Sequence, residues 1–344
     1  DWSSDVCSSD LTWSKKDQVL AALRAHGCRL VFHVASPDPN SSNVALFRAV
    51  NVDGTRTLLA ACREAGVRTF IYTSTASVVW QGVGQAGVDE STPYPTTFRD
   101  AYAATKAEAE AAVMAAGGPD LTTVSLRPHS IFGPRDPTML PTVVRLAEAG
   151  RNTFIVGDGT NVVDWTYVGN VVHAHLLAAE VAQREGPAAA ANGRTYFITN
   201  DEPVPFWRFM NWIVLGMGYN PATRRLPYSF VLGLGYVAQT LVDAVDATCR
   251  RGKRPLQLTL SPSRLQIAGT AHWYSVAAAK RDLGYKPVWN LAQAVYLTLK
   301  AFSNKRNIRP PPYALENARR GNLLALKLLN DTTRRGQSAS ENKE

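Results

Sequence analysis

The chain alternates short apolar runs with longer segments in which apolar residues recur about every 3.6 positions. Runs without polar interruption are typical of strands that are buried on both faces of a parallel sheet. The predicted strands are residues 29–34, 68–73, 121–126 and 162–167, and the predicted helices are residues 43–65, 100–116, 138–149 and 170–182. Helices of this length between strands predict βαβ crossovers, and therefore a doubly wound parallel sheet of the α/β class.

The alternation stops at about residue 200, where residues 206–217 and 226–245 become apolar, aromatic and helix-like. The predicted organisation is a non-native leader at residues 1–11, a larger α/β domain at 12–200, a smaller and mostly helical domain at 201–305, and a basic tail at 306–344. The leader is predicted because the first eleven residues are rich in Ser and Asp, show no helix or strand period and lack a start methionine. The alternative for this segment is an ordinary frayed terminus.

Composition and charge narrow the class of protein. The chain is 45% hydrophobic and 19% charged, which excludes a disordered, collagen-like or coiled-coil protein. Residues 1–200 carry 16 basic and 19 acidic side chains, whereas residues 201–344 carry 21 and 9. The basic second half favours an anionic partner, either lipid head groups or nucleic acid. The basic cluster Arg250–Arg254 has no interleaved aromatic residues and no reader motif, so we expect no nucleic-acid partner.

Cysteine and histidine spacing gives no sign of a metal site. The four cysteines show no paired spacing, so the sequence predicts neither a disulfide framework nor a zinc site. His173 and His175 are two residues apart on a predicted helix and therefore face different ways. His33 lies in a predicted buried strand, where we expect a hydrogen-bonded core histidine rather than a ligand.

Residues 226–245 are mostly apolar over about one membrane-spanning length, and Arg224–Arg225 and Arg250–Arg254 lie at the two ends. One interpretation is a buried helix of the smaller domain. The other is a helix that enters or lies on a membrane, with its basic ends attracted to anionic lipid.

The chemistry concentrates around one tyrosine. The strand at 68–73 ends in a run of hydroxyl residues that includes Ser74 and Thr75, at the sheet edge where ligands bind in doubly wound folds. Tyr102 and Lys106 are four residues apart on the next helix and therefore share a face. We expect the ammonium to lower the phenol pKa, as general acid–base chemistry near neutral pH requires. A tyrosine and a lysine with this spacing are more often surface residues, but the order of hydroxyl-rich strand end, helix and following strand favours a site.

Three motifs together resemble the extended short-chain dehydrogenase/reductases, and within them the 3-beta-hydroxysteroid dehydrogenase/isomerase family, in its branch that acts on sterols. They are residues 73–78 (TSTASV), Tyr102-x-x-x-Lys106 and residues 127–136 (RPHSIFGPRD). Further similar segments are residues 31–37, 51–55, 164–170 and 279–287. The likeness covers about residues 29–300 and implies a Rossmann-like fold.

The resemblance implies a role for each matching residue. Tyr102 would be the general base that takes the proton from a sterol 3β-hydroxyl while hydride leaves C3 for NAD, with NADP as the alternative. Lys106 would lower the tyrosine pKa and bind the nicotinamide ribose. Thr75 matches the catalytic Ser/Thr, and Ser74 is its neighbour and fallback. The implied cofactor-binding residues, besides Tyr102 and Lys106, are Ala35, Ser36, Asn51, Pro128 and Ile131. A carboxylate at C4 would lie beta to the new ketone and would leave as carbon dioxide.

One departure from the family pattern is large. The glycine-rich turn that cradles the dinucleotide pyrophosphate is absent upstream of Val31, and so is the acidic residue that follows it. We therefore expect a truncated chain that lacks the first βαβ unit and binds the cofactor poorly.

Several alternatives stay open at this point. They are a simpler 3-beta-hydroxysteroid dehydrogenase/isomerase, a nucleotide-sugar epimerase or reductase of the same fold, and an inactive, membrane-associated Rossmann remnant. The resemblance also implies the cytosolic face of the endoplasmic reticulum membrane, with the cytoplasm as the alternative, and leaves a homodimer open.

Overall fold

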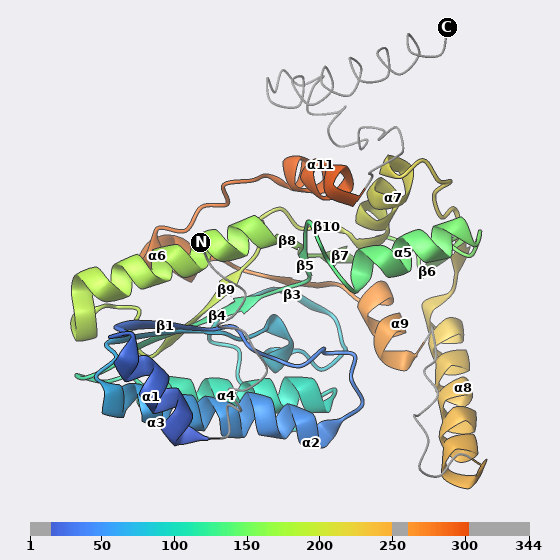
Figure 1. Cartoon of the computed structure of the whole chain (residues 1–344). Coiled ribbons are helices and arrows are strands. Elements are labelled where there is room, and N and C mark those ends of the chain that lie inside the picture. Colours follow the sequence, from blue (N-terminus) through green and yellow to red (C-terminus); the bar gives the residue numbers. More distant parts are fainter. Residues whose placement is uncertain (1–14, 250–260, 303–344) are drawn as a thin grey trace, which may run out of the picture.

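Four parallel strands form the central sheet of the protein (Figure 1). The computed structural model describes residues 15–249 and 261–302. In spatial order the strands are β1 (Leu30–His33), β2 (Thr69–Thr73), β4 (Thr122–Pro128) and β9 (Arg194–Ile198). Every residue of β4 is buried, because helices cover both faces of the sheet. The fold is therefore the doubly wound, Rossmann-like α/β class that the sequence predicts.

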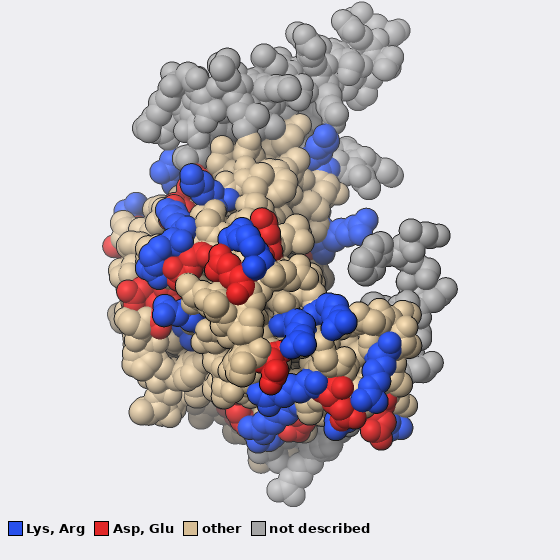
Figure 2. All heavy atoms as spheres, turned by 90° about the vertical axis from the view of Figure 1, so that its left-hand side faces the viewer, with Lys and Arg blue, Asp and Glu red and all other residues tan. Residues whose placement is uncertain are grey.

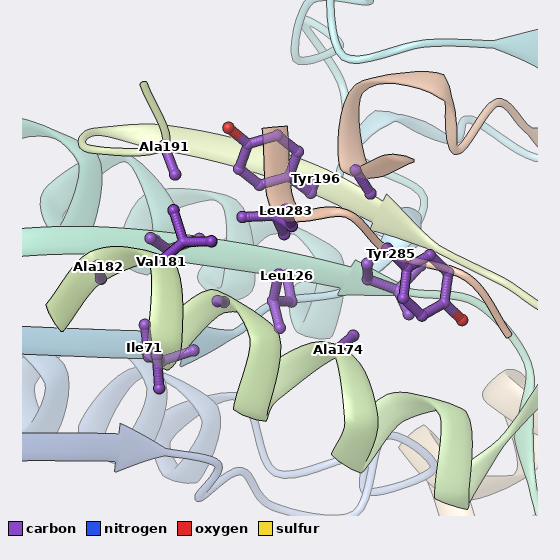
Figure 3. Close-up of a cluster of buried hydrophobic side chains, with 14 of the residues drawn as sticks. Ile71, Leu126, Ala174, Val181, Ala182, Ala191, Tyr196, Leu283 and Tyr285 are labelled. Carbon is purple, nitrogen blue, oxygen red and sulfur yellow. The ribbon is translucent and has the colours of Figure 1, made fainter. Parts of the chain in front are cut away.

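The two helical layers pack on opposite faces of the sheet (Figure 1). One layer contains α1 (Lys16–Ala25), α3 (Thr55–Ala65) and α4 (Ala101–Ala116), and the other contains α6 (Val168–Glu185) and α10 (Ala277–Leu283). Figure 3 shows the second layer, in which Ala174 and Ala182 of α6 lie close to Ile71 and Leu126 of the strands. Small side chains at these helix positions allow α6 to approach the sheet closely.

Three predicted strands, at residues 29–34, 68–73 and 121–126, match β1, β2 and β4 within two residues at their ends. The prediction of one strand at 162–167 is wrong, since the segment divides into β7 (Val162–Val163) and β8 (Thr166–Tyr167). Asp164 interrupts it, because its buried carboxylate accepts a hydrogen bond from the Tyr274 amide at 2.6 Å. The strand β9 was not predicted, because its apolar run is only three residues long and follows a loop rich in Ala and Gly. The helix α1 was not predicted either.

The predicted helix at 43–65 contains an irregular turn. It consists of α2 (Val44–Phe47), the π-helix η2 (Arg48–Gly54) and α3. The wider turn contains Asn51, whose carbonyl accepts a hydrogen bond from Thr55 Oγ1 at 2.5 Å. Such π-helical turns occur frequently at functional sites.

A second sheet joins segments from both halves of the chain. Its order is β10 (Val204–Pro205), β7, β12 (His272–Tyr274) and β3 (Gln85–Val88). Leu283 and Tyr285, which follow β12, are buried in the core beneath α6. Residues 272–285 thus pack with the larger domain, and the predicted domain division at residue 200 stays a prediction.

The other described elements surround this framework. They are η3 (Ala76–Val79), β5 (Ile131–Phe132), α5 (Met139–Glu148), β6 (Phe154–Val156), η4 (Gly186–Ala188), α7 (Phe206–Gly216), β11 (Arg224–Leu226), α8 (Tyr228–Cys249), α9 (Pro262–Gly269) and α11 (Leu291–Phe302). Helix α8 extends away from the body of the molecule (Figure 1).

The structure describes only some of the basic residues in the second half of the chain. Most of its basic residues, including Arg250–Arg254 and the tail at 306–344, lie outside the described residues, as does the leader at 1–11. Figure 2 shows basic and acidic side chains interspersed on one face of the protein. Some exposed side chains form ion pairs, such as that of Lys16 with Glu64 at 2.6 Å.

Candidate active site

A cavity of about 590 Å³ lies at the carboxyl edge of the central sheet. The predicted residues that line it are Ser74, Thr75, Tyr102, Pro128 and Ile131. They come from the end of β2, the first turn of α4, and the β4–β5 connection. Because parallel strands all end at this edge, the fold brings together residues that are far apart in the chain.

Tyr102 is placed by the start of α4. Asp100 caps this helix by accepting a hydrogen bond from the Ala103 amide at 2.8 Å. The Tyr102 ring packs edge-on against Phe47, with ring centroids 5.8 Å apart, and its hydroxyl is hydrogen-bonded to Thr75. Burial raises the pKa of Tyr102 to about 12, while the Thr75 hydrogen bond acts in the opposite direction. The phenol therefore holds its proton at neutral pH.

Lys106 lies one turn further along α4 and is buried beneath the end of β2. Its Nζ donates a hydrogen bond to the Thr73 carbonyl at 2.6 Å and lies 4.2 Å from the centre of the Tyr72 ring. Burial lowers the pKa of Lys106 to about 7, against the opposing effect of the Glu110 charge. Lys106 is not among the groups that shift the Tyr102 pKa in this arrangement, because its ammonium is directed to the strand carbonyl, and its expected effect on the phenol stays a prediction.

The two candidate hydroxyl residues at the end of β2 have different surroundings. Ser74 is held by its amide, which donates to the Leu126 carbonyl at 2.7 Å, and its buried side chain is among the groups that lower the Glu110 pKa. Thr75 Oγ1 accepts a hydrogen bond from the Ser77 amide at 3.2 Å. Thr75 also lowers the Tyr102 pKa, whereas Ser74 does not act on it. Thr75 is therefore the better candidate for the hydroxyl that works together with the phenol.

The residues predicted near the end of β1 lie beside this cavity rather than in its lining. Asn51 is buried and donates from Nδ2 to Thr105 Oγ1 at 3.1 Å, and its Oδ1 accepts from Ser36 Oγ at 3.0 Å. These bonds tie the loop after β1 to the helix that carries Tyr102. Ala35 lines a separate, mostly apolar hollow of about 370 Å³ on the outer side of β1.

His33 is the core histidine that the sequence predicts. Its Nε2 lies 2.8 Å from Thr55 Oγ1, and burial lowers its pKa to about 3, with a smaller effect of the Lys106 charge. The ring is therefore neutral at physiological pH. The Thr55 hydroxyl in turn donates to the carbonyl of the π-helical turn, so His33 supports that turn.

Sequence reasoning missed a buried ion pair below the site. Glu110 follows Lys106 by four residues, so the spacing that links Tyr102 and Lys106 continues for one more turn and could have revealed it. Its Oε1 accepts a hydrogen bond from Arg127 Nη2 at 2.6 Å, and both oxygens lie 3.1 Å from Arg127 Nε. Burial opposes ionisation of Glu110, but the Arg127 charge holds its pKa below the usual value.

Sequence reasoning also missed one wall of the cavity. Arg99 Cζ lies 4.7 Å from the centre of the Trp80 ring, and His272 stacks on Trp80 with centroids 4.5 Å apart. His129 meets His272 edge-on at 4.9 Å. These residues come from separate segments, and no local pattern links them. Within the described ranges, 15–249 and 261–302, no cluster of three metal-ligating side chains occurs.

Residues 3–228 match the sequence family described as the 3-beta hydroxysteroid dehydrogenase/isomerase family. The chain belongs to this family. Two mammalian members are named sterol-4-alpha-carboxylate 3-dehydrogenase, decarboxylating. The mouse protein is 42% identical over 282 residues, which cover 81% of this chain and 76% of its own length. The human protein is 39% identical over 307 residues, which cover 89% and 78%.

Solved structures support the fold of this 3-beta hydroxysteroid dehydrogenase/isomerase family member. A UDP-glucose 4-epimerase from Thermotoga maritima, solved with UDP-glucose, superimposes with a TM-score of 0.61 and covers 85% of this chain and 83% of its own. Its sequence identity is 19%, so this similarity shows the Rossmann-like fold alone. The segments that carry the family resemblance, residues 73–78 and 127–136, both contribute to the cavity that contains Tyr102.

Proposed function

We propose that this member of the 3-beta hydroxysteroid dehydrogenase/isomerase family oxidises the 3β-hydroxyl of a 4α-carboxysterol, with NAD as the hydride acceptor, and that the β-keto acid then loses carbon dioxide. The observation that carries the proposal is that Tyr102 and Thr75 line the same cavity at the sheet edge. The names of relatives about 40% identical to this chain support the choice of substrate.

In the proposed oxidation, the substrate oxygen lies against the Tyr102–Thr75 pair. Thr75 Oγ1 is fixed by the Ser77 amide, so its own proton can be donated to the substrate oxygen as negative charge develops there. Tyr102 takes the proton of the 3-hydroxyl. Because the pKa of Tyr102 is about 12, proton removal by this residue is favoured by alkaline pH or by a nearby positive charge.

The residues around the cavity fit a nicotinamide nucleotide. Tyr102 offers a hydroxyl group on one side, and Pro128 and Ile131 offer an apolar surface for a flat ring. Lys106 lies one turn further along α4, outside the cavity lining, and is proposed to contact the nicotinamide ribose when the nucleotide is bound. Ile131 is 44% exposed and lines the cavity, so its side chain is available to a bound ring. Bound NAD would supply the hydride acceptor and a positive charge. Ala35, Ser36 and Asn51 are proposed to contact the same nucleotide from the end of β1, with NADP as the alternative to NAD.

The same two hydroxyl groups can assist the loss of carbon dioxide. After oxidation, the C4 carboxylate lies beta to the C3 ketone. When the bond between C4 and the carboxyl carbon breaks, its electron pair moves to the ketone oxygen as an enolate, and C4 is then protonated. Hydrogen bonds from Tyr102 and Thr75 to that oxygen stabilise the developing charge.

The alternative functions, a sugar-nucleotide enzyme or an inactive remnant, receive less support than a sterol dehydrogenase. The sugar-nucleotide enzymes among the structural neighbours share the fold at below 25% identity, whereas the sterol enzymes share about 40% of the sequence. The comparisons give no support to an inactive remnant. A simpler 3β-hydroxysteroid stays the alternative substrate.

We also propose that α8 binds a membrane surface of anionic lipid, from which a sterol would enter the cavity. Among the described residues, one 18-residue span, Tyr228–Val245, is long and apolar enough to cross a membrane, and only 11% of it is buried. Five of its apolar residues are exposed at spacings of three or four, and so share one face: Phe230, Leu234, Val237, Leu241 and Val245. Exposed Arg224 and Arg225 lie just before the helix and suit anionic head groups. The endoplasmic reticulum membrane, as the particular membrane, stays a prediction of the sequence.

An assay of the full 344-residue chain tests the enzymatic proposal. The chain would be incubated with a 4α-carboxysterol in detergent micelles, and with UDP-glucose in parallel. Both reactions would contain NAD at a saturating concentration, because the sequence predicts weak cofactor binding. We expect NADH and carbon dioxide to form in equal amounts from the sterol, and no UDP-galactose to form from the sugar nucleotide. Turnover of the sugar nucleotide, or the absence of NADH with the sterol, would contradict the proposal.

A further inference from the structure

We propose that Arg99 binds the substrate's carboxylate and thereby selects sterols that carry an acid next to the reacting hydroxyl. This inference rests on the proposed function, because it assumes that the 3-hydroxyl is held at Tyr102.

Arg99 is held in place from two sides. Its Nε and Nη2 donate to Asp100 Oδ2 at 2.9 and 2.6 Å, and its guanidinium carbon lies 4.7 Å from the centre of the Trp80 ring. Only 13% of the side chain is exposed, and the residue lines the same cavity as Tyr102. A guanidinium carries five N–H donors, so the Asp100 carboxylate leaves donors for a second acid. The side chain is thus preorganised, which lowers the entropy lost on binding.

The position of the carboxyl group on the substrate determines that a cation binding it must lie near Tyr102. The carboxyl group is attached to C4, the carbon next to C3, so a hydroxyl at Tyr102 places the carboxylate close to the phenol. Arg99 precedes Tyr102 by three residues at the start of α4, and its charge is close enough to lower the Tyr102 pKa against the larger effect of burial. Arg135 also lines the cavity, but it is exposed and lies in the loop between β5 and α5.

A second observation marks the same wall as a polar subsite. His272 is fully buried, stacks on Trp80, and uses Nδ1 for a hydrogen bond with the Thr270 carbonyl at 2.9 Å. Its Nε2 is buried without a hydrogen-bond partner, although His272 lines the cavity. Because Nδ1 must donate to the Thr270 carbonyl, Nε2 of the neutral ring is an acceptor, which suits a donor group at this wall and leaves the carboxylate to Arg99.

A purely structural role for Arg99 makes a different prediction. If the guanidinium served only to hold Asp100 at the start of α4, its replacement would disturb Tyr102 and slow every substrate equally. The two roles therefore separate when one variant is tested with two substrates of similar shape, only one of which is charged.

The test compares a 4α-carboxysterol with the matching 4α-carboxamide, which has a similar shape but no charge. In the wild-type full chain, we expect kcat/KM to favour the carboxylate about ten- to hundredfold, the range of a charge-assisted hydrogen-bonded pair. In Arg99→Gln this ratio should fall to within about threefold of unity, while Arg135→Gln should keep the wild-type ratio.

Three results would overturn the inference. The ratio could stay at its wild-type value in Arg99→Gln, because both substrates lose equally or neither loses. The ratio could instead collapse in Arg135→Gln. Finally, the wild-type chain could oxidise neither sterol, and this result alone would also refute the proposed function.

Discussion

Glu110 of α4 and Arg127 of β4 form a buried ion pair, with Oε1 and Nη2 2.6 Å apart and side chains that are 0% and 4% exposed. Tyr94 and Ser125 donate to the same carboxylate at 2.6 and 2.9 Å. The pair joins the helix that carries Tyr102 and Lys106 to the sheet. It therefore supports the site without lining the cavity.

Glu110→Gln should destabilise the fold strongly. It would leave the Arg127 charge buried without its counter-ion, which typically costs about 3–5 kcal/mol. Urea unfolding measures this loss. The double variant Glu110→Gln/Arg127→Met removes the stranded charge and should recover at least half of the lost free energy of unfolding. A single-variant loss below about 1 kcal/mol would show that the pair contributes little.

His33 should make the protein sensitive to acid. Its pKa is about 3 in the folded chain and near 6.5 when unfolded, so the unfolded state binds the extra proton between these values. The stabilisation is complete above pH 6.5 and is lost as pH falls toward 3, by about 2 kcal/mol at pH 5. Denaturant unfolding at pH 7.5 and pH 5 should therefore show a smaller pH effect, by about this amount, in His33→Gln. An equal pH effect in both proteins would contradict the assignment.

Gly269→Ala should weaken the attachment of α8. A Cβ atom at Gly269 would clash with Cδ2 of the Tyr228 ring, at the start of α8, so the ring would have to move. We expect a loss of about 1–3 kcal/mol in the free energy of unfolding. Gly233→Ala is the matched control, because a Cβ there meets nothing within 4 Å and alanine favours the helix. If both variants were equally stable, the close contact would carry no energetic weight.

The apolar face of α8 should govern membrane binding. Leu234→Glu/Leu241→Glu places two charges on the exposed stripe, whereas Ser229→Glu/Thr240→Glu places the same charges on exposed positions away from it. With vesicles that contain anionic lipid, flotation of the first variant should fall at least about tenfold, because it loses apolar contacts with the lipid as well as electrostatic attraction. Flotation of the second variant should fall less, because that variant loses only the electrostatic part. Equal flotation of the two variants would contradict the proposal that α8 enters the lipid.

Three of the four strands of the parallel sheet are predictable from the sequence, because they are mostly apolar and alternate with helices of clear period, whereas β9 has only three apolar residues in a row. The Tyr102–Lys106 spacing and the hydroxyl run at Ser74 and Thr75 are also local patterns, so these residues could be named in advance. The hydrogen-bond partner of Lys106, and therefore its effect on the site, could not be predicted from local patterns. Whether Lys106 points to the phenol or to the Thr73 carbonyl depends on packing between α4 and β2.

The missed residues share a physical reason. Arg99, Trp80 and His272 meet only because β12 returns to pair with β3, which places His272 opposite Gln85. A contact between segments almost two hundred residues apart has no periodic signal in the sequence.

The most direct test of the central claim is the rate of sterol oxidation by Tyr102→Phe, measured as NADH formation in the full chain. Loss of the general base should lower kcat by about a hundred- to ten-thousandfold. Tyr219→Phe is the matched control, since the Tyr219 hydroxyl contacts Glu148 outside the cavity, and it should keep wild-type turnover. A Tyr102→Phe enzyme with unchanged turnover would contradict the assignment of the reaction to this site.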